Sequence, residues 1–141
     1  MCRALTLTLA ILFAATVARA ESIAVALYKN PQCSCCDEYA QYLRQNGFSV
    51  TVTSTTDVSL ISRQHSVPGN LAGCHIMLID GYVVEGHVPV GAIKKLLTGR
   101  PKIKGISLPG MPEGSPGMAG AKKEPFTIYE ISDQPKAFAV E

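Results

Sequence analysis

The sequence predicts an α/β fold in which a small mixed sheet is flanked by helices. Residues 23–28 form an almost uninterrupted apolar run, as in a strand buried on both faces. Residues 34–46 carry apolar side chains at helical spacing. Asp80-Gly81 separates two short apolar runs, as in a tight β-hairpin. We therefore predict the order strand, helix, strand, helix, strand, strand, helix.

The first 20 residues have the pattern of a secretory signal peptide. Arg3 precedes an apolar run over residues 4–17, and Ala18-Arg19-Ala20 precedes Glu21. This run is too short to favour a membrane span, and no later segment approaches the roughly 20 apolar residues that a span needs. We expect cleavage near Glu21 to leave a soluble, periplasmic protein.

The charge balance of the mature chain argues against a nucleic-acid partner. The formal net charge of +2 comes from Arg3 and Arg19, because all acidic residues lie from Glu21 onward. A neutral chain has no basic patch for phosphates. Its length suits one domain with one core over residues 21–100, and residues 101–141 form an extension that packs on it.

The first predicted helix begins after Asn30-Pro31, which breaks the preceding strand. Asp37 and Glu38 would lie in its first turn, where carboxylates favour the helix dipole, and Gly47 provides the C-terminal stop. The predicted helix buries one apolar stripe made of Cys36, Tyr39, Ala40 and Leu43.

The remaining elements of the domain follow from similar signals. Residues 48–53 alternate apolar and polar side chains like a half-exposed strand, and a short helix spans about residues 57–65. Residues 76–79 and 82–84 are the strands of the hairpin. A helix then begins at Pro89 and ends at Gly99 and Pro101.

The C-terminal extension is rich in proline and glycine. We predict that residues 101–125 form a loop without a helix or a central strand. In this loop Pro109-Gly110-Met111 returns as Pro116-Gly117-Met118. Residues 126–131 are a predicted strand that anchors the far end of the loop, and the last ten residues are a predicted mobile tail.

Three of the five cysteines, Cys33, Cys35 and Cys36, lie at the predicted strand-to-helix junction. A helix N-terminus stabilises thiolates, which both metal binding and redox attack require. Neighbouring cysteines pair only with strain, so Cys33 with Cys36 is the one comfortable local disulfide, with Cys74 as a possible distant partner.

The predicted order of elements resembles the thioredoxin and glutaredoxin fold, which carries reactive cysteines at this same junction. In that fold, Cys74-His75 at the start of the hairpin would lie beside the cluster. A third thiol between Cys33 and Cys36 suits a metal better than it suits a redox pair, because it could capture a mixed disulfide.

The ligand types indicate which metal is bound. Cysteine together with histidine and methionine favours Cu(I), and several ions could share bridging thiolates. The additional candidate ligands are His75, His87, Met111 and Met118. Four thiolates would also suit a structural zinc ion, although only one CxxC pair is present. A plain structural disulfide and a thiol-disulfide oxidoreductase using Cys33 and Cys36 remain alternatives.

Several motifs together resemble the periplasmic copper-resistance proteins of the CopG type. The motifs are Cys33-Ser34-Cys35-Cys36, Gly73-Cys74-His75, Asp80-Gly81-Tyr82, Glu85-Gly86-His87-Val88-Pro89 and the Gly/Met/Pro-rich C-terminal segment. The resemblance implies a thioredoxin-like domain that binds copper through Cys33, Cys35, Cys36 and Cys74. It also implies weaker roles for the two histidines and two methionines. We expect a metal-binding protein first, with copper redox activity as a further property and other periplasmic copper-handling proteins as partners.

Overall fold

The computed structural model describes residues 22–141, so the predicted signal peptide of residues 1–20 lies outside the described part. Within the described residues, no helix is long and apolar enough to cross a membrane.

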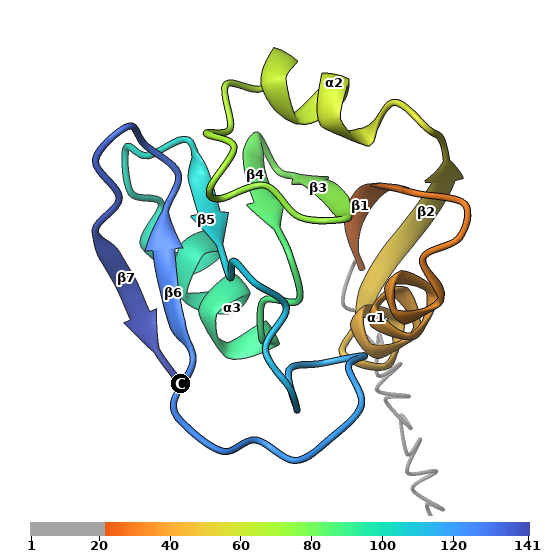
Figure 1. The fold of residues 1–141 in the computed structure, drawn as a ribbon. Coiled ribbons are helices and arrows are strands. Elements are labelled where there is room, and N and C mark those ends of the chain that lie inside the picture. The colour runs from red at the N-terminus through yellow and green to blue at the C-terminus, as the bar shows by residue number, and fades with distance from the viewer. Residues whose placement is uncertain (1–21) are drawn as a thin grey trace, which may run out of the picture.

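A single seven-stranded sheet forms the centre of the molecule (Figure 1). Its strand order is β2-β1-β3-β4-β5-β6-β7. The strands are β1 (Ile23–Lys29), β2 (Phe48–Ser54), β3 (His75–Ile79), β4 (Tyr82–Glu85), β5 (Gly105–Ser107), β6 (Thr127–Glu130) and β7 (Ala137–Val140). The helices are α1 (Ser34–Gln45), α2 (Val58–Gln64) and α3 (Val90–Gly99). The mixed α/β fold predicted from the sequence is confirmed.

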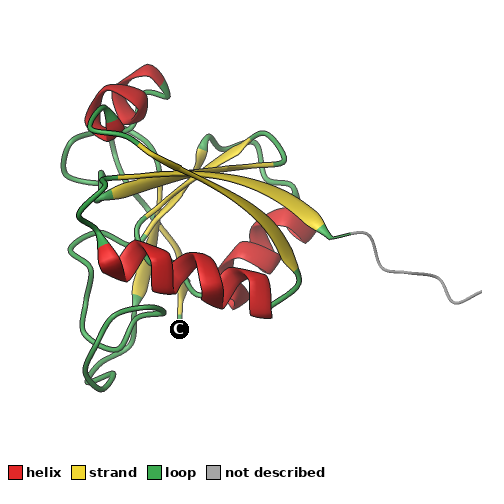
Figure 2. Cartoon of the chain, turned by 90° about the vertical axis from the view of Figure 1, so that its right-hand side faces the viewer, coloured by secondary structure: helices red, strands yellow, loops and turns green. Residues whose placement is uncertain are grey.

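Helices cover both faces of the sheet. Figure 2 shows α1 and α3 on one face and α2 on the other. Tyr39 of α1 and Ile93 of α3 are fully buried in the larger core cluster, whereas Val58 of α2 lies in a separate, smaller cluster. Strand β1 contributes Leu27 to the first cluster and Tyr28 to the second, as expected for a strand covered on both sides.

The pairing of β1 with β3 brings the two cysteine-bearing segments together where β1 ends and β3 begins. β1 pairs in parallel with β2, to which the chain connects it through α1. On its other side β1 pairs antiparallel with β3. The antiparallel register sets Lys29, the last residue of β1, opposite His75, the first residue of β3. The start of α1 and the start of β3 are therefore neighbours. The β3–β4 hairpin turns at Asp80 and Gly81, both with positive φ, as a type I′ turn requires.

The prediction that residues 101–125 contain no central strand is wrong. Gly105–Ser107 forms β5, which is paired with β4 on one side and β6 on the other. All three residues are buried. A Cβ on Gly105 would collide with the backbone of Val83, so glycine here permits close strand packing. The strand is too short and too close to proline and glycine for its pattern to be visible in the sequence.

The prediction of a mobile C-terminal tail is also wrong. Residues 137–140 form β7, which pairs antiparallel with β6. Phe126 and Glu141 exchange two backbone hydrogen bonds of 2.7 and 3.0 Å. Phe138 and Ala139 also pack against the main core. A four-residue strand at the edge of a sheet has almost no periodic signal in the sequence. For this reason the sequence predicted a mobile tail here.

Candidate metal centre

The metal centre is built where the start of α1 meets the start of β3. The N–H of Asn30 donates to the carbonyl of Cys74 at 3.3 Å, and the N–H of Cys33 donates to the carbonyl of Asn30 at 3.0 Å. Asn30 therefore connects the two cysteine-bearing segments through the backbone. Cys33 is the N-cap of α1, and its side chain makes no capping hydrogen bond.

All four cysteines of the described chain converge there. Their sulfur atoms lie within 4.8 Å of one another. Cys33 and Cys36 form a disulfide, which is the one local pair that the sequence analysis considered comfortable. Cys35 and Cys74 are free. Cys74 Sγ lies 3.1 Å from Cys33 Sγ and 3.3 Å from Cys36 Sγ, and Cys35 Sγ lies 3.4 Å from Cys33 Sγ. Cys74 therefore faces both halves of the disulfide.

The two histidines lie beneath the cysteines in the interior. Cys36, Cys74, His75 and His87 form a second group whose ligand atoms also lie within 4.8 Å of one another. Both imidazoles are fully buried, and their rings contact Tyr39 at centroid distances of 5.0 and 5.1 Å. The structure thus brings His75 and His87 to the cysteine cluster from two different strand ends.

Backbone carbonyls fix the tautomer of each histidine. His75 Nε2 lies 3.0 Å from the carbonyl of Gly86, and His87 Nδ1 lies 2.6 Å from the carbonyl of Pro116. A carbonyl only accepts, so those nitrogens carry the protons. His75 Nδ1 and His87 Nε2 are left with lone pairs. Hydrogen bonds of this kind orient metal-binding histidines.

The lone pair of His75 Nδ1 faces one weak donor, the thiol of Cys74 at 4.0 Å, and that of His87 Nε2 faces none among the described residues. His87 Nε2 is buried and lacks a hydrogen-bond partner among the described residues. His75 Nδ1 lies 3.4 Å from Cys36 Sγ, and neither atom carries a proton while the disulfide is intact. A cation placed between these atoms would satisfy them. The donor set therefore fits a metal ion.

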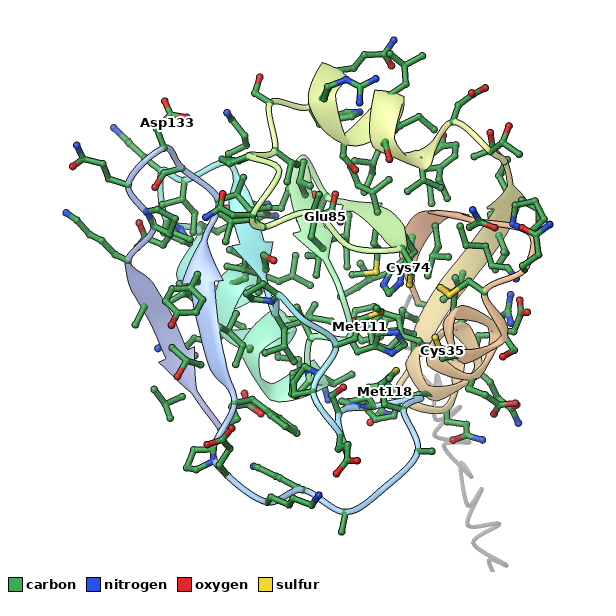
Figure 3. All side chains as sticks on the ribbon, in the orientation of Figure 1. Cys35, Cys74, Glu85, Met111, Met118 and Asp133 are labelled. Atoms are coloured by element: carbon green, nitrogen blue, oxygen red, sulfur yellow. A yellow bond between two sulfur atoms is a disulfide. The ribbon has the colours of Figure 1, made fainter. Side chains whose placement is uncertain are left out.

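The methionines of the two Pro-Gly-Met repeats are placed differently. The thiol of Cys74 lies 3.3 Å from Met111 Sδ, so Met111 joins the cluster (Figure 3). Met118 lies on the same loop beside α1 (Figure 3). The loop is held near α1 at Gly117, where a Cβ would lie 2.7 Å from Tyr39 N.

An open groove leads from the surface to the cluster. It has a volume of about 370 Å³ and reaches Cys33, Cys35, Cys74 and Met111. Its other wall is formed mainly by polar residues of the segments around α1 and α2, including Asn30, Gln32, Thr56 and Ser59. Cys36 and both histidines lie deeper, since they are fully buried. A metal ion that enters through this groove would thus meet sulfur atoms before the imidazoles.

Burial governs the protonation of the site. It raises the pKa of Cys74 to about 11, with the nearby Cys35 as the next cause. It lowers the pKa of His75 to about 3 and that of His87 below its usual value, so both imidazoles are neutral and able to bind metal. A metal ion that binds Cys74 must displace its proton, because the thiolate is the ligand.

Two charged residues at the site were not identified from the sequence as parts of it. Lys29 is buried at the end of β1, and its Nζ donates to the carbonyl of Cys33 at 3.0 Å and to Asp37 at 2.7 Å. Glu85 is buried at the end of β4, and burial raises its pKa to about 7. Glu85 stands in the Glu85-Gly86-His87-Val88-Pro89 motif, although no role was predicted for it, and the signal for Lys29 is a lysine at the end of an apolar strand pattern.

The fold and the site together define a metal-binding α/β protein whose donors are mainly sulfur. Two solved structures are similar to it, "Copper resistance protein copG- Form 2" and "Copper resistance protein copG- Form 1". Both align with a TM-score of 0.78 and 35% sequence identity over 86% of this chain, covering 99% and 98% of theirs. Residues 71–118 match the family described as "Protein of unknown function, DUF411". Among curated proteins there is no significant match. The chain belongs to the family of the CopG copper resistance proteins.

Proposed function

We propose that this protein is a periplasmic copper-binding protein that holds Cu(I) ions through bridging thiolates and so contributes to copper resistance. The observation that carries the proposal is the position of Cys74, whose sulfur lies within 3.4 Å of three other sulfur atoms from two other segments of the chain. Thiolate and thioether sulfur with neutral imidazole is a donor set that favours Cu(I).

More than one copper ion fits this arrangement. Four cysteine sulfurs form one group, and two of them belong also to the histidine-containing group. Because Cys36 and Cys74 are shared, they can bridge ions in the two groups. Met111 is positioned to complete the coordination on the groove side.

Copper loading is linked to the state of the Cys33–Cys36 disulfide. These two cysteines become ligands only after a dithiol reductant supplies two electrons and two protons, which yields two thiols and an oxidised reductant. Export supports the presence of this disulfide, since disulfides persist in oxidising compartments such as the periplasm. The signal-peptide pattern of residues 1–20 supports the same location.

The test is anaerobic Cu(I) binding to the reduced mature chain in competition with a chelator of moderate affinity, with native mass spectrometry to count ions. The wild-type protein is expected to retain copper. Cys35→Ser and Cys36→Ser variants are expected to lose most of it. Copper retained equally by the variants, or lost by the wild type, contradicts the proposal.

A second candidate function is thiol-disulfide exchange by Cys33 and Cys36. The disulfide at the N-terminus of α1, with Cys33 reachable from the groove, favours it. This activity would survive Cys35→Ser and disappear with Cys33→Ser. Copper retention would fail in both variants, so the two functions are separable in the same pair of proteins.

A further inference from the structure

Glu85 is a buried carboxylate that connects three segments around the metal centre. It is fully buried at the end of β4. Its Oε1 accepts a hydrogen bond of 2.6 Å from the hydroxyl of Ser62 in α2, and its Oε2 accepts one of 2.9 Å from the N–H of Gly73. Figure 3 shows Glu85 between α2 and Cys74.

The sheet itself does not require a carboxylate here. The preceding β4 residues Val83 and Val84 are buried and apolar, and an isolated buried carboxylate costs several kcal/mol before its hydrogen bonds are counted. Both partners of Glu85 lie on segments that border the metal centre. Gly73 is the residue before Cys74, and α2 begins at Val58, which lines the groove.

The Gly73 segment lies in van der Waals contact with the segment around Gly86. A Cβ on Gly73 would lie 3.4 Å from Gly86 N and 3.6 Å from Glu85 Oε2. The same two segments are also joined two residues after Gly73, where His75 Nε2 donates to the carbonyl of Gly86. The side chain of Glu85 is therefore one of two polar side-chain links between the Gly73–His75 segment and the end of β4, and it is the one that holds the backbone directly before Cys74.

We propose that Glu85 is a positioning residue for Cys74, which it holds at bridging distance from the other sulfur atoms. Its hydrogen bond to Gly73 fixes the backbone from which the Cys74 side chain projects. The bond to Ser62 fixes the carboxylate in turn. This inference rests on the proposed copper-binding function, because the distance of Cys74 from its neighbours matters most when a metal must be shared.

The test compares Glu85→Met, which keeps the size but removes both hydrogen bonds, with Glu85→Gln, which can still accept from Gly73 and donate to Ser62. Cu(I) affinity of the reduced protein is measured by chelator competition. We expect Glu85→Met to weaken binding at least tenfold, in the range seen when a hydrogen-bond partner of a metal ligand is lost. Glu85→Gln should stay within about twofold, as should the exposed control Glu124→Met.

A double-mutant cycle with Cys74→Ser separates positioning from general damage. If Glu85 acts through Cys74, Glu85→Met weakens Cu(I) binding in the wild-type background and has no further effect in the Cys74→Ser background. An equal loss in both backgrounds overturns the proposal. So does a Glu85→Gln variant that is as weak as Glu85→Met.

A metal-free measurement keeps this test distinct from that of the proposed function. In the reduced apoprotein, Glu85→Met should raise the rate at which iodoacetamide alkylates Cys74 relative to Cys35, as resolved by peptide mass spectrometry. Unchanged relative rates overturn the positioning role even if copper binds. If Glu85→Met does not fold, Ser62→Ala replaces it in the same cycle, with an expected loss of severalfold that must vanish in Cys74→Ser.

Discussion

Cys74 is the residue at which the separate parts of the site meet. Its sulfur contacts Cys33 and Cys36 from the start of α1 and Met111 from the C-terminal loop. Its neighbour His75 adds an imidazole whose free nitrogen faces Cys36. With sulfur neighbours from two segments, a thiolate in this position is placed to share metal ions with them.

The two loop methionines provide a test of the site at single-residue resolution. Met111→Leu removes a thioether that lies 3.3 Å from Cys74 Sγ, so Cu(I) affinity should fall about tenfold, equivalent to 1.4 kcal/mol. Met118→Leu is the matched control, because it makes the same chemical change on the same loop at a thioether that forms no hydrogen-bond-length contact with Cys74. Chelator competition measures both, and equal effects would contradict the assignment of Met111 to the site.

Much of the site could be predicted from residue types and spacing. The CxCC cluster and Cys74 were expected to lie together, because the predicted order of elements resembles the thioredoxin fold, in which the start of the hairpin lies beside the start of the first helix. Lys29 and Glu85 could not be assigned roles in this way. Their importance depends on which backbone atoms lie near their side chains, and this is a property of packing between segments far apart in the sequence.

At the scale of elements, β5 joins the cysteine-bearing part of the sheet to its C-terminal part. Gly105→Ala should lower the free energy of unfolding by about 3 kcal/mol, because the new methyl group would collide with the backbone of Val83. Gly69→Ala, where nothing lies within 4 Å, is the control and should stay within about 0.5 kcal/mol. Urea unfolding measures both. A similar small change in the two variants would refute the role of close packing at β5.

The loop between β5 and β6 approaches α1 at Gly117. A Cβ there would lie 2.7 Å from Tyr39 N and 2.9 Å from the carbonyl of Cys35. Gly117→Ala should therefore lift the loop from α1 and reduce Cu(I) affinity about tenfold more than Gly110→Ala does. Gly110 has a similar positive φ, +80° against +81°, but open space around it. Affinities that fall equally would show that only backbone strain matters.

Helices and hairpins were predictable where their signals are local. The helix near residues 34–46 has an apolar stripe and a glycine stop, and Asp80-Gly81 marks the hairpin by its turn chemistry. β5 and β7 lack such signals. Both are short, and each exists because a neighbouring strand offers free hydrogen-bonding groups, so pairing within the whole sheet determines them.

At the scale of the whole molecule, the hydrophobic core does not depend on the metal centre. The main cluster extends from α1 across the sheet to α3 and β6, and the second lies under α2. The metal-free, reduced protein should thus keep its secondary structure and unfold cooperatively, with copper only raising its melting temperature. Circular dichroism after chelation measures this. Unfolding upon metal removal would instead indicate a structural metal site such as zinc.

Binding of more than one Cu(I) ion by the thiolates of this domain is tested most directly by X-ray absorption at the copper edge of the anaerobically loaded mature protein. This measurement reports oxidation state, ligand atoms and neighbouring metals together. We expect Cu(I) in a mainly sulfur environment with a second copper ion as a near scatterer. Copper found as Cu(II) with only nitrogen and oxygen ligands, or as isolated ions without a copper neighbour, would contradict it.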